Sequence, residues 1–186
     1  MNAVGFSPTS ELNTTEKEFD NILYSTPLKK TSTNEDILST QQYELQHAVK
    51  KIRTILANKS GKDDGLEKLI MIDTIKRLAL DHYFQEEIAA ILAAHNSEWC
   101  TLDEEGGGDL HEVALRFRLL RQEGYHVTCD ALNKFKGKNG KFKQELSKDT
   151  RGLMSLFEAS HLGIQGEDIL DEAREFSTQL LKTSLK

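Results

Sequence analysis

The sequence predicts an all-α fold, and three observations support this prediction. Proline, the strongest breaker of helices, occurs only twice among the 186 residues. Apolar residues recur three and four positions apart along most of the chain, which is the spacing of one helix face. No stretch alternates between apolar and polar residues for long enough to form a strand. About seven helices joined by short turns are therefore predicted.

The start of the chain differs from the rest. Residues 1–34 are polar, contain both prolines and lack helical spacing, so they are predicted to form a flexible N-terminal arm. The helical domain is predicted to run from residue 35 to residue 186, with Asn34 as the N-cap of its first helix. The apolar stripe of this first helix is predicted to consist of Leu38, Leu45, Val49, Ile52 and Leu56.

Two more helices are predicted after a glycine-containing turn at residues 58–65. The third helix is expected to extend from about Tyr83 to Ala94. A loop is expected from Asn96 to Gly108, because this stretch is polar and ends in three glycines. One side of the second helix is predicted to carry Leu66, Leu69, Ile70, Ile75 and Leu78.

Four helices are predicted after this loop, each with a residue suited to a helix end. The first of them is strongly amphipathic, with its apolar stripe formed by Leu110, Val113, Phe117 and Leu120. The expected end residues are Asp109 and Gly124 for this helix, Thr128 for a short helix, Asp149 or Thr150 for the next, and Gly166 before the last.

Composition excludes several classes of protein. Thirty acidic residues against 24 basic ones give a net charge of −6, which disfavours nucleic-acid binding. Cys100 and Cys129 form no close pair, so neither a disulfide scaffold nor a zinc module is expected. No apolar run or signal peptide is found, so no membrane partner is expected. A reducing compartment, the cytoplasm, is predicted, with a plastid as the alternative.

The stretch from Glu167 to Glu172 is the strongest candidate for metal chemistry. Its Glu-Asp-x-x-Asp pattern places carboxylates one helical turn apart, and Mg²⁺ prefers oxygen ligands. The alternative is structural: acidic residues are favoured in the first turn of a helix by its dipole. Asp168, Asp171, Glu172 and Glu175 are then expected on the solvent face, and we favour this interpretation.

The stretch from Lys134 to Lys143 contains five lysines, two phenylalanines and no acidic residue. Basic residues interleaved with aromatic ones can hold a single-stranded nucleic acid. Because the rest of the chain is acidic, we favour a solvated turn with Phe135 and Phe142 in the core.

Three arginines of one predicted helix, Arg116, Arg118 and Arg121, could grip a phosphate through their bidentate guanidinium groups. Their spacing does not place all three on one narrow face. Ion pairs with Glu112 and Glu123 are the favoured alternative.

Other patterns for catalysis are not complete. The glycines at 106–108 lack the Gly-Lys-Ser/Thr of a phosphate-binding loop, and no Gly-x-Ser-x-Gly is present. No histidine pairs with another four residues on; they are His47, His82, His95, His111, His126 and His161. No catalytic, cofactor-binding or metal-ligating residue is therefore assigned.

Several long stretches resemble the N-terminal domain of plant terpene synthases, in matching order and spacing. They lie between about residue 41 and residue 186, and they are residues 69–78, 81–84, 110–127, 152–160 and 166–173. The resemblance implies a helical, α-barrel-like domain that precedes a catalytic C-terminal domain. The Mg²⁺-binding (or Mn²⁺-binding) Asp-Asp-x-x-Asp motif of the family lies in that second domain, and so does its Arg-x-Arg.

The chain is most similar to the linalool and nerolidol synthases, which make acyclic terpene alcohols. Many cyclising relatives carry an Arg-Arg pair, eight further residues and then Trp near the N-terminus. This chain has no Arg-Arg pair, and its only tryptophan, Trp99, lies much too late. The resemblance implies a parent enzyme that removes diphosphate from geranyl or farnesyl diphosphate. This chain is expected to be an inactive N-terminal part of it, from a fragment or a truncated product.

The alternative is a non-catalytic helical module. A terpene synthase N-terminal domain without its catalytic half is expected to expose apolar helix faces, which favour docking or self-association. A terpene synthase C-terminal domain or a second copy of the chain is then the expected partner.

Overall fold

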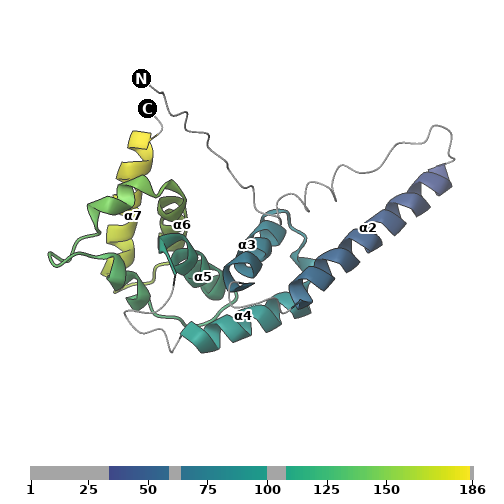
Figure 1. The fold of residues 1–186 in the computed structure, drawn as a ribbon, viewed down its shortest axis with the longest axis horizontal. Coiled ribbons are helices and arrows are strands. Elements are labelled where there is room, and N and C mark those ends of the chain that lie inside the picture. Colours follow the sequence, from purple (N-terminus) through teal and green to yellow (C-terminus); the bar gives the residue numbers. More distant parts are fainter. Residues whose placement is uncertain (1–33, 59–63, 100–107, 185–186) are drawn as a thin grey trace, which may run out of the picture. The chain divides into compact units, whose positions relative to one another are not determined.

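The fold is all-α, as predicted, in a computed structural model that describes residues 34–58, 64–99 and 108–184 (Figure 1). No strand is formed within these ranges, and a single antiparallel bridge joins Lys136 and Phe142. Residues 1–33, which carry nearly all of the predicted arm, lie outside the described ranges. The α-helices are α2 (Asn34–Ala57), α3 (Asp64–Arg77), α4 (Gln85–Trp99), α5 (Leu110–Gln122), α6 (Thr150–Ser160) and α7 (Asp168–Ser184). Three short 3-10 helices are η1 (Asp81–Tyr83), η2 (Asp130–Phe135) and η3 (Gln144–Lys148).

The chain divides into two compact units, residues 1–54 and residues 55–186. In the first unit the structure describes one element, the larger part of α2. The apolar stripe predicted for this helix is wrong at its N-terminal end, since Leu38 is 60% and Leu45 is 44% exposed. The described part of this unit contains no second helix against which these side chains could pack.

The second unit is built around α5. Ten of its 13 residues are buried, because α3, α4, α6 and η2 all contact it. The predicted stripe from Leu110 to Leu120 is confirmed, but burial continues around the helix and includes Arg116 and Arg118. Two charged side chains thus lie in an environment where each needs a partner.

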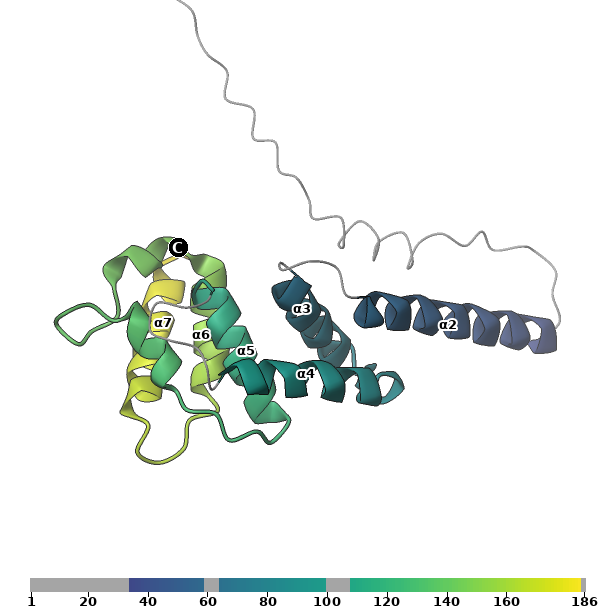
Figure 2. The same ribbon diagram turned by 60° about the horizontal axis from the view of Figure 1, so that its bottom comes forward.

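Helices α5 and α6 lie side by side and run in the same direction (Figure 2). Their contacts keep one order along both helices: His111, in the first turn of α5, bonds Ser155 in the middle of α6, and Arg118 pairs with Glu158 farther on. A Cβ atom on Gly152 would lie 3.0 Å from Leu110 Cβ. The glycine therefore permits the close approach of the two N-terminal ends. Helix α7 follows α6 after a short turn, and Arg174 Nη2 donates to the Ser160 carbonyl at 2.9 Å.

Three of the predicted helix ends are confirmed. Asp109 accepts from the Glu112 amide at 2.9 Å, and Asp149 accepts from the Gly152 amide at 2.8 Å. Gly124 adopts φ +85°, and the amide of Tyr125 donates to the Leu120 carbonyl, so α5 ends in the glycine turn typical of helix C-termini.

Two predictions about boundaries are wrong. Thr128 caps no helix, because η2 is a 3-10 helix flanked by Cys129 and has no side-chain cap. The predicted loop begins too early, because α4 continues to Trp99. Trp99 is 7% exposed and its ring centroid lies 6.1 Å from that of Phe117, so packing on α5 extends the helix. Residues 100–107 of that loop lie outside the described ranges.

Candidate functional site

The carboxylates of the Glu167–Glu172 stretch do not converge. Glu167 precedes α7 and accepts from Arg121, including an Nη1–Oε2 bond of 2.6 Å. Glu172 is paired with Lys136 at 2.7 Å, on a different side of the helix. These bonds lower the pKa of both carboxyl groups. Each acid therefore neutralises a nearby cation of the protein.

The solvent-face prediction holds for part of this stretch. Asp168, Asp171 and Glu175 are exposed, and Asp171 lies 3.6 Å from Arg174. The prediction is wrong for Glu172, which is half-buried. The sequence predicts Glu167 in the first turn of the last helix, but it precedes α7, which begins at Asp168. Among the residues that the structure describes, no group of three or more His, Cys, Asp and Glu side chains could hold a metal ion.

The lysine-rich stretch forms a tight hairpin against α7. The amide of Gly137 donates to the Lys141 carbonyl at 2.8 Å, next to the bridge between Lys136 and Phe142. Phe142 is buried, as predicted, and stacks on Phe176 with the ring centroids 5.3 Å apart. Phe135, also expected in the core, is only half-buried.

The lysines of this hairpin contact the protein itself. Lys136 and Lys141 both reach Glu172, and Lys143 donates to the Lys134 carbonyl at 2.8 Å. Lys134 donates to the Gly108 carbonyl at 3.0 Å. Lys134, Lys136 and Lys141 thus attach the hairpin to its surroundings, and Lys143 closes it internally.

The three arginines of α5 bind three different sets of partners. Arg116 pairs with Glu112 at 2.7 Å, as predicted. Arg118 instead pairs with Asp73 of α3, and Arg121 with Glu167 before α7. The predicted partner Glu123 binds Lys76, so that part of the prediction is wrong. Arg118 and Arg121 therefore join α5 to other elements, whereas Arg116 pairs within α5.

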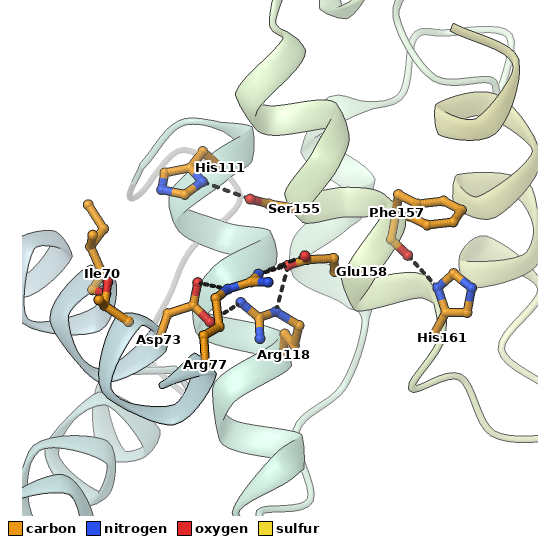
Figure 3. Close-up of polar contacts among 10 residues, drawn as sticks. Ile70, Asp73, Arg77, His111, Arg118, Ser155, Phe157, Glu158 and His161 are labelled. Atoms are coloured by element: carbon orange, nitrogen blue, oxygen red, sulfur yellow. Dashed lines mark hydrogen bonds and ion pairs between the residues drawn. The ribbon is translucent and has the colours of Figure 1, made fainter. Parts of the chain in front are cut away.

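Arg118 belongs to a closed network of four charged residues that links α3, α5 and α6 (Figure 3). Its Nη2 lies 2.7 Å from Asp73 Oδ1, and its Nε lies 3.3 Å from Glu158 Oε2. Arg77 completes the ring, with Nε 2.9 Å from Asp73 Oδ2 and Nη2 2.6 Å from Glu158 Oε2. The two acids raise the pKa of Arg77 and hold it charged. The two arginines neutralise the two acids. Because these residues come from α3, α5 and α6, their ion pairs hold the three helices together.

Arg121 binds partners on several segments of the second unit. Besides Glu167, it donates to the carbonyls of Val127 and Leu162, both at 2.8 Å. Its guanidinium carbon lies 4.4 Å from the centre of the Phe117 ring. Because its side chain is only 12% exposed, these bonds replace water as the partner of the cation. Arg121 thereby joins the C-terminal end of α5 to the turn between α6 and α7.

A buried histidine–serine pair lies beside the network (Figure 3). His111 Nδ1 and Ser155 Oγ are 2.7 Å apart, and burial lowers the pKa of His111. Nucleophilic catalysis also needs a group that orients the base. His111 Nε2 has no hydrogen-bond partner within the described part of the chain, so the third member of such a triad is missing there.

Most of these contacts could not be found in the sequence. Asp73, Arg118 and Glu158 lie at least 40 positions apart, so no local spacing relates them. Gly152 carried a detectable signal, since glycine is unfavourable inside a helical pattern and needs a packing reason. The described charged side chains of α5 chiefly connect it to other elements.

A family model described as the N-terminal domain of terpene synthase matches residues 17–186. β-Caryophyllene synthase of Phyla dulcis is 44% identical over 161 residues, which is 85% of this chain and 29% of that protein. (−)-Germacrene D synthase of Vitis vinifera is 43% identical over 142 residues, which is 76% of this chain and 25% of that protein. The chain thus spans less than a third of the length of these curated relatives.

Solved structures show the same relationship. Isoprene synthase from leaves of grey poplar (Populus x canescens) matches with a TM-score of 0.69 and 36% identity, over 86% of this chain and 30% of that one. A structure of the same enzyme, in complex with three Mg²⁺ ions and dimethylallyl-S-thiolodiphosphate, matches with a TM-score of 0.67 and 34% identity, over 82% of this chain and 29% of that one. This chain belongs to the terpene synthase family and matches its N-terminal domain.

Proposed function

We propose that this chain is the N-terminal helical domain, residues 35–186, of an enzyme of terpenoid biosynthesis, and that it supports a catalytic domain without reacting itself. The observation that carries this proposal is the use of its charged side chains. Arg118 and Arg121 form ion pairs with Asp73, Glu158 and Glu167, and these pairs fix the helices to one another. A domain braced in this way offers a rigid surface rather than a reactive site.

The described residues do not fit the magnesium site that the family implies. The acidic stretch resembles a metal motif, but Glu167 and Glu172 are each bound to a cation of the protein, and Asp168 and Asp171 are exposed. We therefore derive no catalytic step through a metal in this chain. Mg²⁺ (or Mn²⁺) is proposed as a cofactor of the parent enzyme only.

For the parent enzyme we propose loss of diphosphate from geranyl or farnesyl diphosphate. Capture of the allylic cation by water would give linalool or nerolidol. The lack of an Arg-Arg pair separated by eight residues from a tryptophan supports an acyclic product, because that motif accompanies many cyclising relatives. The relatives described above are named for other terpenes, so this product rests on the motif alone.

The proposed partner is a terpene synthase C-terminal domain. Leu78, Met154 and Ile164 of the second unit are 53%, 54% and 67% exposed, and apolar side chains of this size favour a protein contact. The second candidate function, a non-catalytic interaction module, rests on the same three residues.

No described helix is long and apolar enough to cross a bilayer. We propose the cytoplasm as its location, with a plastid as the alternative, since some relatives are named chloroplastic.

Product formation tests the proposal. The purified chain is incubated with geranyl or farnesyl diphosphate and Mg²⁺, and volatile products are measured by gas chromatography with mass spectrometry. We expect no terpene above a boiled control, because Glu167 and Glu172 of the acidic stretch are already bound to cations of the chain. Turnover that exceeds the boiled control and disappears on chelation of Mg²⁺ would contradict it.

A further inference from the structure

A buried histidine in the N-terminal turn of α5 faces the middle of α6. His111, in the first turn of α5, is 8% exposed, and Ser155 of α6 is 7% exposed. Their side chains meet at 2.7 Å, in the region where a Cβ on Gly152 would lie 3.0 Å from Leu110 Cβ (Figure 3). His111 thus follows directly on Leu110, the residue of α5 that lies close to Gly152.

The hydrogen bonding of His111 suits a neutral ring. A neutral imidazole has one N–H group and one acceptor nitrogen, whereas an imidazolium has two N–H groups. Ser155 can serve Nδ1 in either form, because a hydroxyl both donates and accepts. Nε2 is buried and lacks a hydrogen-bond partner within residues 34–58, 64–99 and 108–184. Protonation would therefore bury an unpartnered donor together with a charge.

The charged groups around His111 come from three helices. They are Asp109 at the start of α5, Asp149 and Arg151 at the start of α6, and Asp73 of α3. All three acids have other partners: Asp109 and Asp149 cap the two helices, and Asp73 binds Arg77 and Arg118. The positive ends of two helix dipoles also lie here and disfavour a cation. Burial and Arg151 accordingly lower the pKa of His111.

We propose that His111 is an acid-sensitive latch, whose protonation releases the N-terminal turn of α5 from α6. Because Nε2 is buried, water can reach the protonated ring only if His111 leaves its place beside Ser155. This latch is a property of the helical domain and does not depend on the proposed enzymatic function.

The direction of the pH effect follows from the lowered pKa. The open state has the ordinary histidine pKa of about 6.5, so above that pH both states are neutral and the latch is fully closed. Below about pH 6.5 the open state binds one more proton, and the opening equilibrium rises by about tenfold per pH unit. The increase stops once the pH falls below the pKa of the closed state.

Amide hydrogen exchange of the 186-residue chain, followed by NMR between about pH 5 and pH 7.5, tests the latch. We expect the amides of residues 112–116 and 153–157 to lose protection as the His111 ring resonance titrates, after correction for intrinsic exchange. His111→Asn keeps a hydrogen-bonding group near Ser155 but does not titrate, so its protection should be independent of pH in this range. His126→Gln, a change at an exposed histidine, should behave like the wild type.

Two results would overturn the latch. One is titration of the His111 resonance in the wild-type chain without any loss of protection at these amides, which is decisive even if His111→Asn fails to fold. The other is an equal loss of protection in α4, around the second buried histidine, His95. That result would show that the whole unit unfolds, since the pKa of His95 is also lowered by burial.

Discussion

Replacing Arg121 by Met is expected to lower the free energy of unfolding by about 3–5 kcal/mol, the range for removing one partner of a buried ion pair. The substitution removes the cation paired with Glu167 and the donor to the carbonyls of Val127 and Leu162. Urea unfolding followed by circular dichroism measures the effect. Arg151→Met, at an exposed position, is the control and should change stability by less than about 0.5 kcal/mol.

Two further observations separate the ion pair from simple loss of packing. The double variant Arg121→Met with Glu167→Met should be more stable than Arg121→Met alone, since it removes the unpaired charge as well. The pKa of Glu167 is lowered in the folded chain, so the pair stabilises above the ordinary carboxyl pKa of about 4.3. This contribution is lost as the pH falls through the folded-state pKa. Equal stability of Arg121→Met and Arg151→Met would disprove the role given to Arg121.

Gly152→Ala is expected to destabilise the chain by about 1–3 kcal/mol, although the same change in an ordinary helix interior stabilises by about 1 kcal/mol. The new Cβ would lie 2.1 Å from Asp149 Oδ2 and 3.0 Å from Leu110 Cβ. It therefore disturbs the cap of α6 and forces α5 and α6 apart. The shift of the urea midpoint is the measurement.

Asp149→Ala serves as the matched control for Gly152→Ala. It removes only the cap, whose loss costs about 1 kcal/mol. A larger effect of Gly152→Ala assigns the difference to crowding between α5 and α6. A stabilised Gly152→Ala chain would contradict the packing of the two helices described here.

The sequence predicted well what short-range chemistry determines. Asp109 and Gly124 mark the ends of α5 correctly, because capping needs only a side-chain oxygen or a positive φ. Periodicity was less informative about burial. It predicts one apolar face, whereas α5 is enclosed by α3, α4 and α6, so Arg116 and Arg118 are buried as well.

Contacts between distant residues could not be predicted from local patterns. The acidic stretch is an example: its residues follow a metal-binding spacing, but Glu167 binds Arg121, 46 positions earlier. Trp99 is another, because its burial against Phe117 extends α4 through a stretch of polar residues. In both cases tertiary packing decided between two locally acceptable interpretations.

We propose that Glu167 and Glu172 brace the helices and that residues 167–172 hold no metal ion. Thermal unfolding of the 186-residue chain in Mg²⁺, against NaCl of equal ionic strength, tests this most directly. A site filled at 100 times its Kd would raise the unfolding free energy by about 2.7 kcal/mol. We predict no stabilisation specific to Mg²⁺. Stabilisation by Mg²⁺ that is lost in Asp168→Asn and Asp171→Asn would contradict the claim.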